Sequence, residues 1–325
     1  MTHILVCGGA GYVGSHMVRA LVREGNRVTV YDNLCTGHRE AVVRGELIVG
    51  DMLERPALDE LFSHYRFDAV MHFAAWSIVV DSVRDPYGYY RNNVVGTLNL
   101  LQAMQTAGVT KLIFSSTAAV YGMPRTAVLD ERHPTEPINP YGATKLAVER
   151  LLRDAFHAYG LRSVSLRYFN AAGADSEGEL GESHQPETHL IPNVLRSALG
   201  QAPRLCVFGD DYPTLDGTCI RDYVHVDDLA DGHARALRYL DDHAGAFCFN
   251  LGSGEGFSVA QVVEAARRVT GCPIPIEKAS RRPGDPPVLV ASRQLAEQEL
   301  GWRPHHSDLE SILASAWRWH CRPRY

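Results

Sequence analysis

ILVCGGAGYVG, residues 4–14, runs from a short apolar segment into a glycine-rich turn. Gly8, Gly11 and Gly14 have the spacing G-x-x-G-x-x-G, and apolar residues at helical spacing follow them. Glycines at these positions permit the tight turn, let the backbone approach a pyrophosphate and seat the next helix on the sheet. The N-terminus of that helix then faces the phosphates. The stretch predicts the strand, turn and helix that open a dinucleotide-binding fold, although such turns also serve packing alone.

A carboxylate follows the second apolar run, residues 27–31, in the place where a dinucleotide-binding unit needs one. Asp32 lies 18 residues beyond Gly14. There it would accept hydrogen bonds from an adenosine ribose and repel a 2′-phosphate, which favours NAD over NADP. A helix N-cap or turn role is the alternative. Asp51, at the end of the third predicted strand, either contacts the adenine or simply forms a turn.

The same alternation continues through the first half of the chain. Apolar strands that alternate with helices require a parallel sheet covered on both faces. We therefore predict an α/β fold in which a Rossmann-like, doubly wound parallel sheet occupies residues 1–170, with a returning segment near 220–250. The further strands are predicted at 46–49, 69–73, 111–115 and 163–168, and the further helices at 56–65, 87–107 and 140–159.

The pattern changes after residue 170. Residues 171–188 are rich in Gly, Glu, Ser and His without a period, and indicate a loop. We expect a smaller mixed α/β lobe over residues 171–325 that binds the substrate. Its helices are predicted at 190–199, 227–240, 259–270, 292–300 and 309–320, and its strands at 224–226 and 247–251.

Composition excludes several classes of protein. The 325 residues carry a net charge of -6, which argues against binding to nucleic acid or to an anionic membrane. No apolar run approaches the roughly 18 residues that a membrane span needs. The N-terminus enters the first strand without a secretory pattern, and the seven cysteines form no C-x-x-C pair. We expect a cytoplasmic protein with no metal site, His225 and Asp227-Asp228 being a strand residue and a helix cap.

Tyr141 and Lys145 are the candidate catalytic pair, four residues apart on one helix face. An ammonium about 5 Å from a phenol, at an effective dielectric constant near 20, favours the phenolate by roughly 3 kcal/mol. That would lower the tyrosine pKa by about two units, so that Tyr141 could accept a proton from a sugar hydroxyl near neutral pH. The alternative is a chance spacing on an amphipathic helix.

Hydroxyl groups close the fifth predicted strand, at the sheet edge where α/β proteins bind ligands. Ser115 and Thr117 lie there, and Thr117 could share a proton with Tyr141. Ala118 and Ala119 follow directly, so there is no carboxylate of the kind that a sugar-nucleotide dehydratase needs to expel water. Elimination chemistry is therefore disfavoured.

Two arginines mark the second lobe as the side that binds a diphosphate. Arg221 and Arg282 lie in segments stiffened by Gly and Pro, and guanidinium groups bind phosphate oxygens in pairs. Asn170, after the sixth predicted strand, could donate to a phosphate or a sugar. Each of these side chains could instead be a solvated charge or a turn residue.

Taken together, these motifs resemble the UDP-glucose 4-epimerase family of extended short-chain dehydrogenase/reductases, nearly from end to end. The resemblance implies a tightly held NAD that is regenerated in each turnover. Tyr141 and Thr117 would flank the sugar C4, with Tyr141 removing the hydroxyl proton while hydride passes to NAD. Lys145 would hold the nicotinamide ribose. The 4-keto sugar would then turn about its diphosphate link and take hydride back on the opposite face. The motifs are Gly8–His16, Asp32-Asn33, His72–Ala75, Asn92-Asn93, Ser115–Gly122, Tyr141–Lys145, Arg167–Asn170, Asp211–Pro213, Arg221–Val226 and Arg281–Asp285.

The resemblance also implies binding residues and an assembly state. A homodimer is expected through helices 87–107 and 140–159. The NAD contacts would come from Gly8, Gly11, Tyr12, Val13, Gly14, Asp32, Asn33, Thr36, Asp51, Met52, Phe73, Ala74, Asn92, Ser115, Tyr141, Lys145 and Tyr168. The UDP-sugar contacts would come from Thr117, Asn170, His189, Leu190, Val207, Arg221, Arg282, Asp285 and Leu289.

Three positions depart from the family pattern. Ser77 stands where many relatives place a lysine near the cofactor phosphates. His189 occupies a substrate-side position that is often asparagine, which leaves its hydrogen bond open. Leu289 lies where some relatives carry a tyrosine that crowds the sugar 2-position. UDP-GlcNAc and UDP-GalNAc are therefore possible further substrates, unless the leucine only packs the pocket wall.

Reversible C4 epimerisation of UDP-glucose and UDP-galactose is the predicted activity. A 4-epimerase of a UDP-pentose or UDP-uronic acid would use the same scaffold. A net-redox short-chain dehydrogenase would instead need added cofactor, and a non-catalytic sensor would be expected to lack Tyr141 or Lys145.

Overall fold

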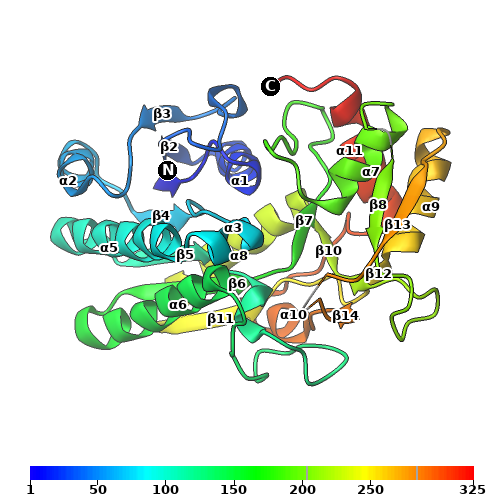
Figure 1. The fold of residues 1–325 in the computed structure, drawn as a ribbon. Coiled ribbons are helices and arrows are strands. Elements are labelled where there is room, and N and C mark those ends of the chain that lie inside the picture. Colours follow the sequence, from blue (N-terminus) through cyan, green and yellow to red (C-terminus); the bar gives the residue numbers. More distant parts are fainter. Residues whose placement is uncertain (203, 283–284) are drawn as a thin grey trace.

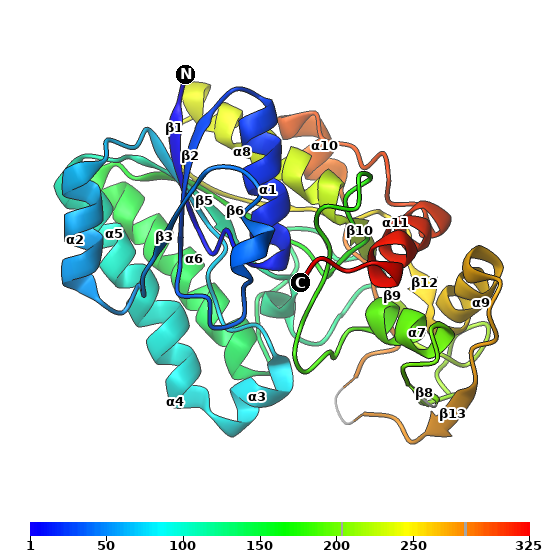
Figure 2. The ribbon, with the colours of Figure 1, turned by 90° about the horizontal axis from the view of Figure 1, so that it is seen from above.

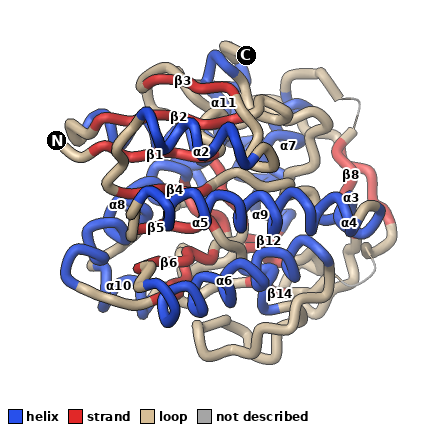
Figure 3. Tube along the Cα trace, turned by 90° about the vertical axis from the view of Figure 1, so that its left-hand side faces the viewer, coloured by secondary structure: helices blue, strands red, loops and turns tan. Residues whose placement is uncertain are grey.

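The computed structural model describes residues 1–202, 204–282 and 285–325, and its central feature is a seven-stranded parallel sheet. The strands lie in the order β11-β6-β5-β4-β1-β2-β3, and Figure 3 shows them stacked from β3 down to β6. This doubly wound order confirms the predicted fold class. The strands are β1 His3–Cys7, β2 Arg27–Asp32, β3 Glu46–Val49, β4 Ala69–His72, β5 Lys111–Ser115, β6 Arg162–Arg167 and β11 Ala246–Asn250.

Helices cover both faces of the sheet because its strands alternate between two apolar cores. In β1, Ile4 and Val6 enter the core under α1 and α8, whereas Leu5 and Cys7 enter the core under α2, α5 and α6. Figure 1 shows the two helical layers on either side of the strands. The covering helices are α1 Tyr12–Arg23, α8 Val226–Asp242, α2 Arg55–His64, α5 Gly96–Ala107 and α6 Pro140–Tyr159.

The second half of the chain contributes to both parts of the molecule. Its α8 and β11 complete the large sheet, since β11 pairs with β6 and α8 packs on α1. The remainder forms a smaller lobe beside the carboxyl ends of the strands, as Figure 2 shows. The elements of this lobe are α7 Leu190–Ala198, α9 Val259–Thr270, α11 Leu309–Cys321, β8 Leu205–Phe208 with β13 Ile276–Ala279, β7 Asn170–Ala172 with β10 Tyr223–His225, and β9 Ile220–Arg221 between β12 Phe257–Ser258 and β14 Val288–Leu289. The short α10 Gln294–Leu300 packs against α8.

The predicted helix 87–107 is helical over its whole length, but it is not α-helical throughout. It consists of α4, Pro86–Tyr89, a π-helical segment, Tyr90–Val95, and then α5. A further helix, α3, Val79–Arg84, precedes it and was not predicted. Asn93 lies inside the π segment, and its side chain bonds the backbone of Trp76 and the hydroxyl of Thr144. These bonds tie the helix to two other segments beside the cavity described below. π turns are typical of such functional positions.

No helix among the described residues is long and apolar enough to cross a membrane.

Candidate active site

A cavity of about 1760 Å³ lies between the sheet and the smaller lobe. Every residue predicted above to contact NAD or the UDP-sugar lines it, including Thr117 and Tyr141 at its centre and Asp32 and Arg282 on its two sides. The fold therefore brings the two predicted sets together in one space. Their individual roles in binding stay predictions.

The three glycines of the turn have different roles: two are needed for packing, and the third leaves room for a ligand. A Cβ on Gly8, whose φ is +81°, would lie 2.4 Å from the backbone nitrogen of Ala74, and one on Gly14 would lie 2.1 Å from the carbonyl oxygen of Gly8. The close packing of the backbone therefore requires glycine at both positions. Gly11 has an ordinary φ of -80°, and its Cβ would meet only the Gly8 oxygen, at 3.5 Å. A glycine at position 11 thus leaves room at the N-terminus of α1 for a ligand, which fits a pyrophosphate.

The Asp32 carboxylate is held in place by the same turn. Its Oδ2 accepts a hydrogen bond from the Ala10 nitrogen at 3.0 Å, and its Oδ1 accepts one from the Leu34 nitrogen at 2.8 Å. Burial raises the pKa of Asp32, and the two backbone donors oppose that rise. Each oxygen keeps a further lone pair for ribose hydroxyls. Asn33 and Asp51 lie alongside, with Asn33 Nδ2 donating to Asp51 Oδ2 at 2.9 Å.

Tyr141 lies in the first turn of α6 because Asn139 and Pro140 begin that helix. The Asn139 side chain accepts from the Gly142 nitrogen at 2.8 Å, and Pro140 needs no partner for a missing N–H. One turn later, Lys145 Nζ donates to the backbone oxygen of Ser115 at 2.7 Å and lies 6.0 Å from the centre of the Tyr141 ring. The predicted pair is therefore on one face, at the end of β5.

The predicted effect of Lys145 on the Tyr141 pKa is wrong in this structure. Burial raises the pKa of Tyr141, and the opposing influence is a hydrogen bond with Thr117 instead of the lysine. Burial also lowers the pKa of Lys145 to about 7, with the charge of Glu149 acting against that fall. A lysine that is only partly charged at neutral pH, and whose Nζ donates to Ser115, stabilises a phenolate weakly.

A buried polar network behind this pair was not predicted from the sequence. Glu149 Oε1 accepts from Ser116 Oγ at 2.6 Å and from Arg167 Nε at 2.9 Å, while Oε2 pairs with the second nitrogen of the guanidinium. The available signal was a carboxylate four residues beyond Lys145 on a helix face that is otherwise apolar. In front of this network, Ser115 Oγ and Tyr168 Oη are hydrogen-bonded at 2.6 Å.

The predicted diphosphate side is built from the small lobe. Arg221 forms an ion pair with Asp285, and the Arg282 guanidinium lies 4.0 Å from the centre of the Phe208 ring. Leu289 is the β14 partner of Arg221 in β9, so the arginine and the leucine lie side by side in the cavity wall. Arg84 also lines the cavity and was missed, because an arginine at a helix end carries no motif.

His189 is the N-cap residue of α7, and its ring is engaged by carboxylates. Its Nδ1 lies 2.6 Å from Glu182 Oε1 and 3.2 Å from Glu187 Oε1. Burial alone would lower the pKa of His189, but the two carboxylates raise it to about 10. Ser77 lines the cavity, where it offers a hydroxyl and no charge.

The turn with its open Gly11 and the acidic end of β2 lie in one cavity with Tyr141, Lys145 and Thr117. Together they define a nucleotide-dependent enzyme of the short-chain dehydrogenase/reductase class. The chain belongs to the NAD dependent epimerase/dehydratase family, whose sequence profile matches residues 4–252.

Relatives that align over nearly the full length of the chain are UDP-glucose 4-epimerases. The chain is 52% identical to the UDP-glucose 4-epimerase of Halalkalibacterium halodurans over 98% of this chain and 95% of the relative. It is 51% identical to that of Corynebacterium glutamicum over 97% of this chain and 94% of the relative. A crystal structure of UDP-glucose 4-epimerase from Brucella ovis in complex with NAD superposes with a TM-score of 0.95, at 48% identity and 98% coverage of both chains. The resemblance stated from the motifs is confirmed.

Proposed function

We propose that this chain interconverts UDP-glucose and UDP-galactose by reversible inversion at C4, with NAD bound throughout. The observation that carries the proposal is one cavity that is lined by Gly11 and Asp32, by Arg221 and Arg282 of the small lobe, and by Thr117 and Tyr141. The close UDP-glucose 4-epimerase relatives support the same activity.

NAD would be held by the N-terminus of α1 at Gly11, by the Asp32 carboxylate and by Lys145 near the reacting end. When bound, it supplies a reversible hydride acceptor and a positive charge. The protein supplies the proton path: Tyr141 Oη accepts the proton of the sugar hydroxyl, and Thr117 Oγ1 bonds the same oxygen. Thr117 is buried and Tyr141 is half-buried, so nearby charges act on them with less screening than at the surface.

The charged side chains are placed so that the sugar can rotate between the two hydride transfers. The charged side chains of the small lobe, Arg221 and Arg282, lie where they would hold the diphosphate, while Leu289 offers the sugar an apolar wall. Ala118 and Ala119 provide no carboxylate beside Thr117 to expel water. Firm binding of the nucleotide with loose binding of the hexose supports inversion instead of elimination or net oxidation.

The test supplies UDP-galactose to the purified protein without added cofactor and measures UDP-glucose. We expect turnover by the wild-type protein and a loss of about 100- to 10,000-fold in Tyr141→Phe, the usual contribution of a general base. Tyr90→Phe is the matched control, since Tyr90 is part-exposed on the π segment and outside the cavity wall. Turnover that depends on added NADH would indicate a net-redox enzyme, and an unimpaired Tyr141→Phe would refute the assigned base.

A wider choice of sugar is a second proposal, carried by Leu289 in the cavity wall. We propose that UDP-GlcNAc and UDP-GalNAc are also interconverted, because a leucine leaves more room than a tyrosine beside the sugar. A 42% identical structure is that of a UDP-Glc/GlcNAc 4-epimerase from Campylobacter jejuni. Leu289→Tyr should reduce the N-acetylated reaction and spare the reaction of UDP-glucose. Absence of UDP-GalNAc formation from UDP-GlcNAc by the wild-type protein would sink this proposal.

A UDP-pentose or UDP-uronic acid remains an alternative substrate on the same scaffold. A 40% identical UDP-glucose-4-epimerase from Stenotrophomonas maltophila carries NAD and formylated UDP-arabinopyranose in its structure. Comparing kcat/KM for UDP-galactose, UDP-xylose and UDP-glucuronate in one assay would rank these substrates.

We propose a homodimer formed through the helical face that includes α5 and α6. Apolar side chains are exposed along the adjoining segments, among them Val80, Val83, Tyr87 and Leu98. Exposed apolar groups in such number mark an interface more often than free surface. Sedimentation should give a dimer that Val83→Asp with Leu98→Asp converts to a monomer, and a monomeric wild-type protein would exclude it. A reducing, cytoplasmic compartment suits the seven free cysteines.

A further inference from the structure

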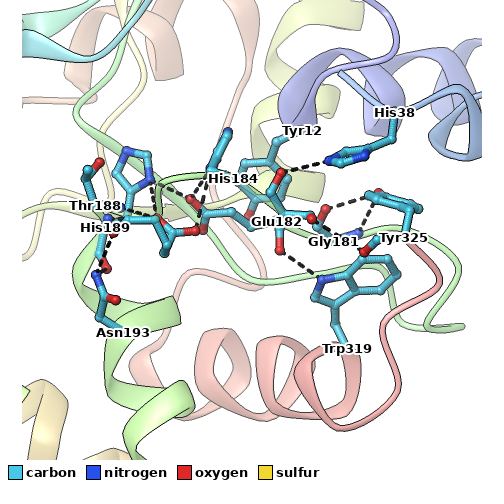
Figure 4. Close-up of polar contacts among 12 residues, drawn as sticks. Tyr12, His38, Gly181, Glu182, His184, Thr188, His189, Asn193, Trp319 and Tyr325 are labelled. Carbon is cyan, nitrogen blue, oxygen red and sulfur yellow. Dashed lines mark hydrogen bonds and ion pairs between the residues drawn. The ribbon is translucent and has the colours of Figure 1, made fainter. Parts of the chain in front are cut away.

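Four side chains with metal-binding chemistry gather on the segment that connects β7 to α7. They have the spacing Glu182-x-His184-x-x-Glu187-x-His189, and Figure 4 shows Glu182, His184 and His189 side by side on this segment. One donor atom from each residue can be chosen so that all four lie within 4.8 Å of one another. Two carboxylates and two imidazoles thus share one small volume.

Four nitrogen–oxygen distances in this group, to one oxygen of Glu182 and to both oxygens of Glu187, lie between 2.6 and 3.7 Å. His189 Nδ1 lies 2.6 Å from Glu182 Oε1 and 3.2 Å from Glu187 Oε1. His184 Nδ1 lies 3.2 Å from Glu182 Oε1 and 3.7 Å from Glu187 Oε2. An ion bonded to nitrogen and oxygen at about 2.0–2.1 Å, in tetrahedral geometry, places its ligand atoms roughly 3.3 Å apart.

The two buried carboxylates in this volume need positive charge beside them. The side chains of Glu182 and Glu187 are only 6% and 3% exposed, and their recorded ion pairs within the described residues involve the two histidines and no lysine or arginine. Two carboxylates so close and so buried require two positive charges nearby. Either both imidazoles carry a proton, or one divalent cation replaces those two protons.

The segment is held from outside by a second set of contacts. Trp319 Nε1 donates to the carbonyl oxygen of Glu182 at 2.9 Å, and Asn193 Nδ2 donates to that of His189 at 2.8 Å. His38 Nε2 lies 3.0 Å from the Ser183 oxygen, and the ring of His38 packs on that of Tyr325. These contacts fix the backbone of the segment, which keeps the four side chains near one another before any ion binds.

We propose that Glu182, His184, Glu187 and His189 bind one divalent transition-metal ion of the Zn²⁺ class. Imidazole with carboxylate suits zinc, whereas calcium and magnesium prefer ligands that are all oxygen. Four protein ligands complete a tetrahedral shell, which is typical of a structural ion instead of a catalytic one. The ion fixes the segment that begins α7, where His189 and Leu190 line the cavity. The proposal departs from the expectation of no metal, and it assigns His189 to the ion instead of to the predicted UDP-sugar contact.

The first test measures zinc binding by the full chain without an affinity tag. After dialysis against a chelator and then buffer, titration calorimetry with ZnCl₂ should give one ion per chain. Removing a ligand in His184→Ala or Glu187→Gln should weaken the affinity by at least about 100-fold, the upper end of the loss seen for residues just outside a ligand shell. The Tm of the wild-type protein should rise when zinc is added, and the Tm of these variants should not.

Two control variants separate this site from ordinary surface binding. His64→Ala removes an exposed histidine of α2, and Glu177→Gln alters the all-carboxylate group of Asp175, Glu177 and Glu179. Both should leave the zinc affinity unchanged. An affinity that falls in the controls, or that stays unchanged in His184→Ala and Glu187→Gln when both are folded by circular dichroism, overturns the proposal.

X-ray absorption of the zinc-loaded wild-type protein identifies the atoms bound to zinc without any variant. The expected first shell holds four nitrogen or oxygen atoms, with the outer scattering of two imidazoles. A shell containing sulfur would assign the ion to exposed thiols such as Cys35, Cys206 or Cys321. Failure of the wild-type protein to bind stoichiometric zinc would leave the cluster as two imidazoliums paired with two carboxylates, and would refute the metal site.

Discussion

Glu149→Gln tests whether the buried network behind Tyr141 supports the reaction. In the wild-type protein the carboxylate of Glu149 accepts from Ser116 Oγ and from two nitrogens of Arg167. Glutamine keeps the volume but loses the charge, and its amide NH₂ meets an Arg167 N–H with no acceptor between them. The Arg167 guanidinium is then left buried without a counter-charge, against the ring of Tyr121.

The expected loss in the free energy of unfolding follows from the burial of Glu149 and Arg167, whose side chains are 1% and 6% exposed. Breaking a buried pair from one side costs about 3–5 kcal/mol. With an unfolding entropy near 2.1 cal/mol/K per residue, a chain of this length loses roughly 1.5 °C of Tm per kcal/mol. Glu149→Gln should therefore lower Tm by about 4–7 °C. Replacing both partners, in Glu149→Leu with Arg167→Met, should restore part of this loss because no charge remains buried.

A change in the pH profile distinguishes positioning from stability alone. Glu149 raises the pKa of Lys145 against the effect of burial, which brings it to about 7. Without that charge the Lys145 pKa falls, so the lysine is cationic only at lower pH. The alkaline limb of kcat/KM should move to lower pH in Glu149→Gln, measured at a temperature where the variant stays folded. An unchanged Tm together with an unchanged alkaline limb would refute both the charged pair and its effect on Lys145.

Three further outcomes follow from particular contacts. Gly181→Ala places a Cβ 2.2 Å from the Trp319 ring and should cost about 1–3 kcal/mol by overpacking, seen as a lower urea midpoint, whereas Gly96→Ala in α5 should be tolerated. Burial raises the pKa of Asp222 to about 6, so the native state binds more protons than the unfolded state between pH 4 and 6. The unfolding free energy of the wild-type protein should fall by roughly 3 kcal/mol as pH rises through that window, relative to Asp222→Asn, in denaturation series at each pH. Arg221→Ala should raise the KM for UDP-galactose by roughly 10- to 100-fold through loss of a charged hydrogen bond, with kcat little changed, in steady-state assays.

The large sheet was predictable because its strands carry their own signal. A buried parallel strand such as β1 is apolar on both faces, and the glycine turn after it has steric reasons at Gly8 and Gly14. The π segment Tyr90–Val95 was not predictable. Its cause is a set of contacts from Asn93 to Trp76 and Thr144, and the second of these lies 51 residues away in the chain. Helical periodicity continues through such a segment and does not report those contacts.

The cavity residues were found from sequence where a motif or a resemblance marked them, and missed where only folding brings them together. Asp32 follows a strand at a meaningful distance from the glycines, so it was predicted. Glu149 has no motif, and its importance comes from burial beside Arg167. Glu182 and His184 were read as part of an irregular polar loop, because nothing in the sequence shows that Trp319 holds that loop in place.

Tyr141 and Lys145 show where reasoning from spacing stops. Four residues on a helix correctly set the two side chains on one face, and a Coulomb energy then predicted a lowered tyrosine pKa. That calculation took the lysine as fully charged and aimed at the phenol. The fold buries both groups, brings the Lys145 pKa to about 7 and directs Nζ to the Ser115 carbonyl oxygen. The phenolate must therefore draw its stabilisation from Thr117 and from positive charge that enters the cavity with the ligands. It follows that a larger fraction of Tyr141 is ionised, and so able to accept the sugar proton, in the loaded enzyme than its place in the chain alone would give.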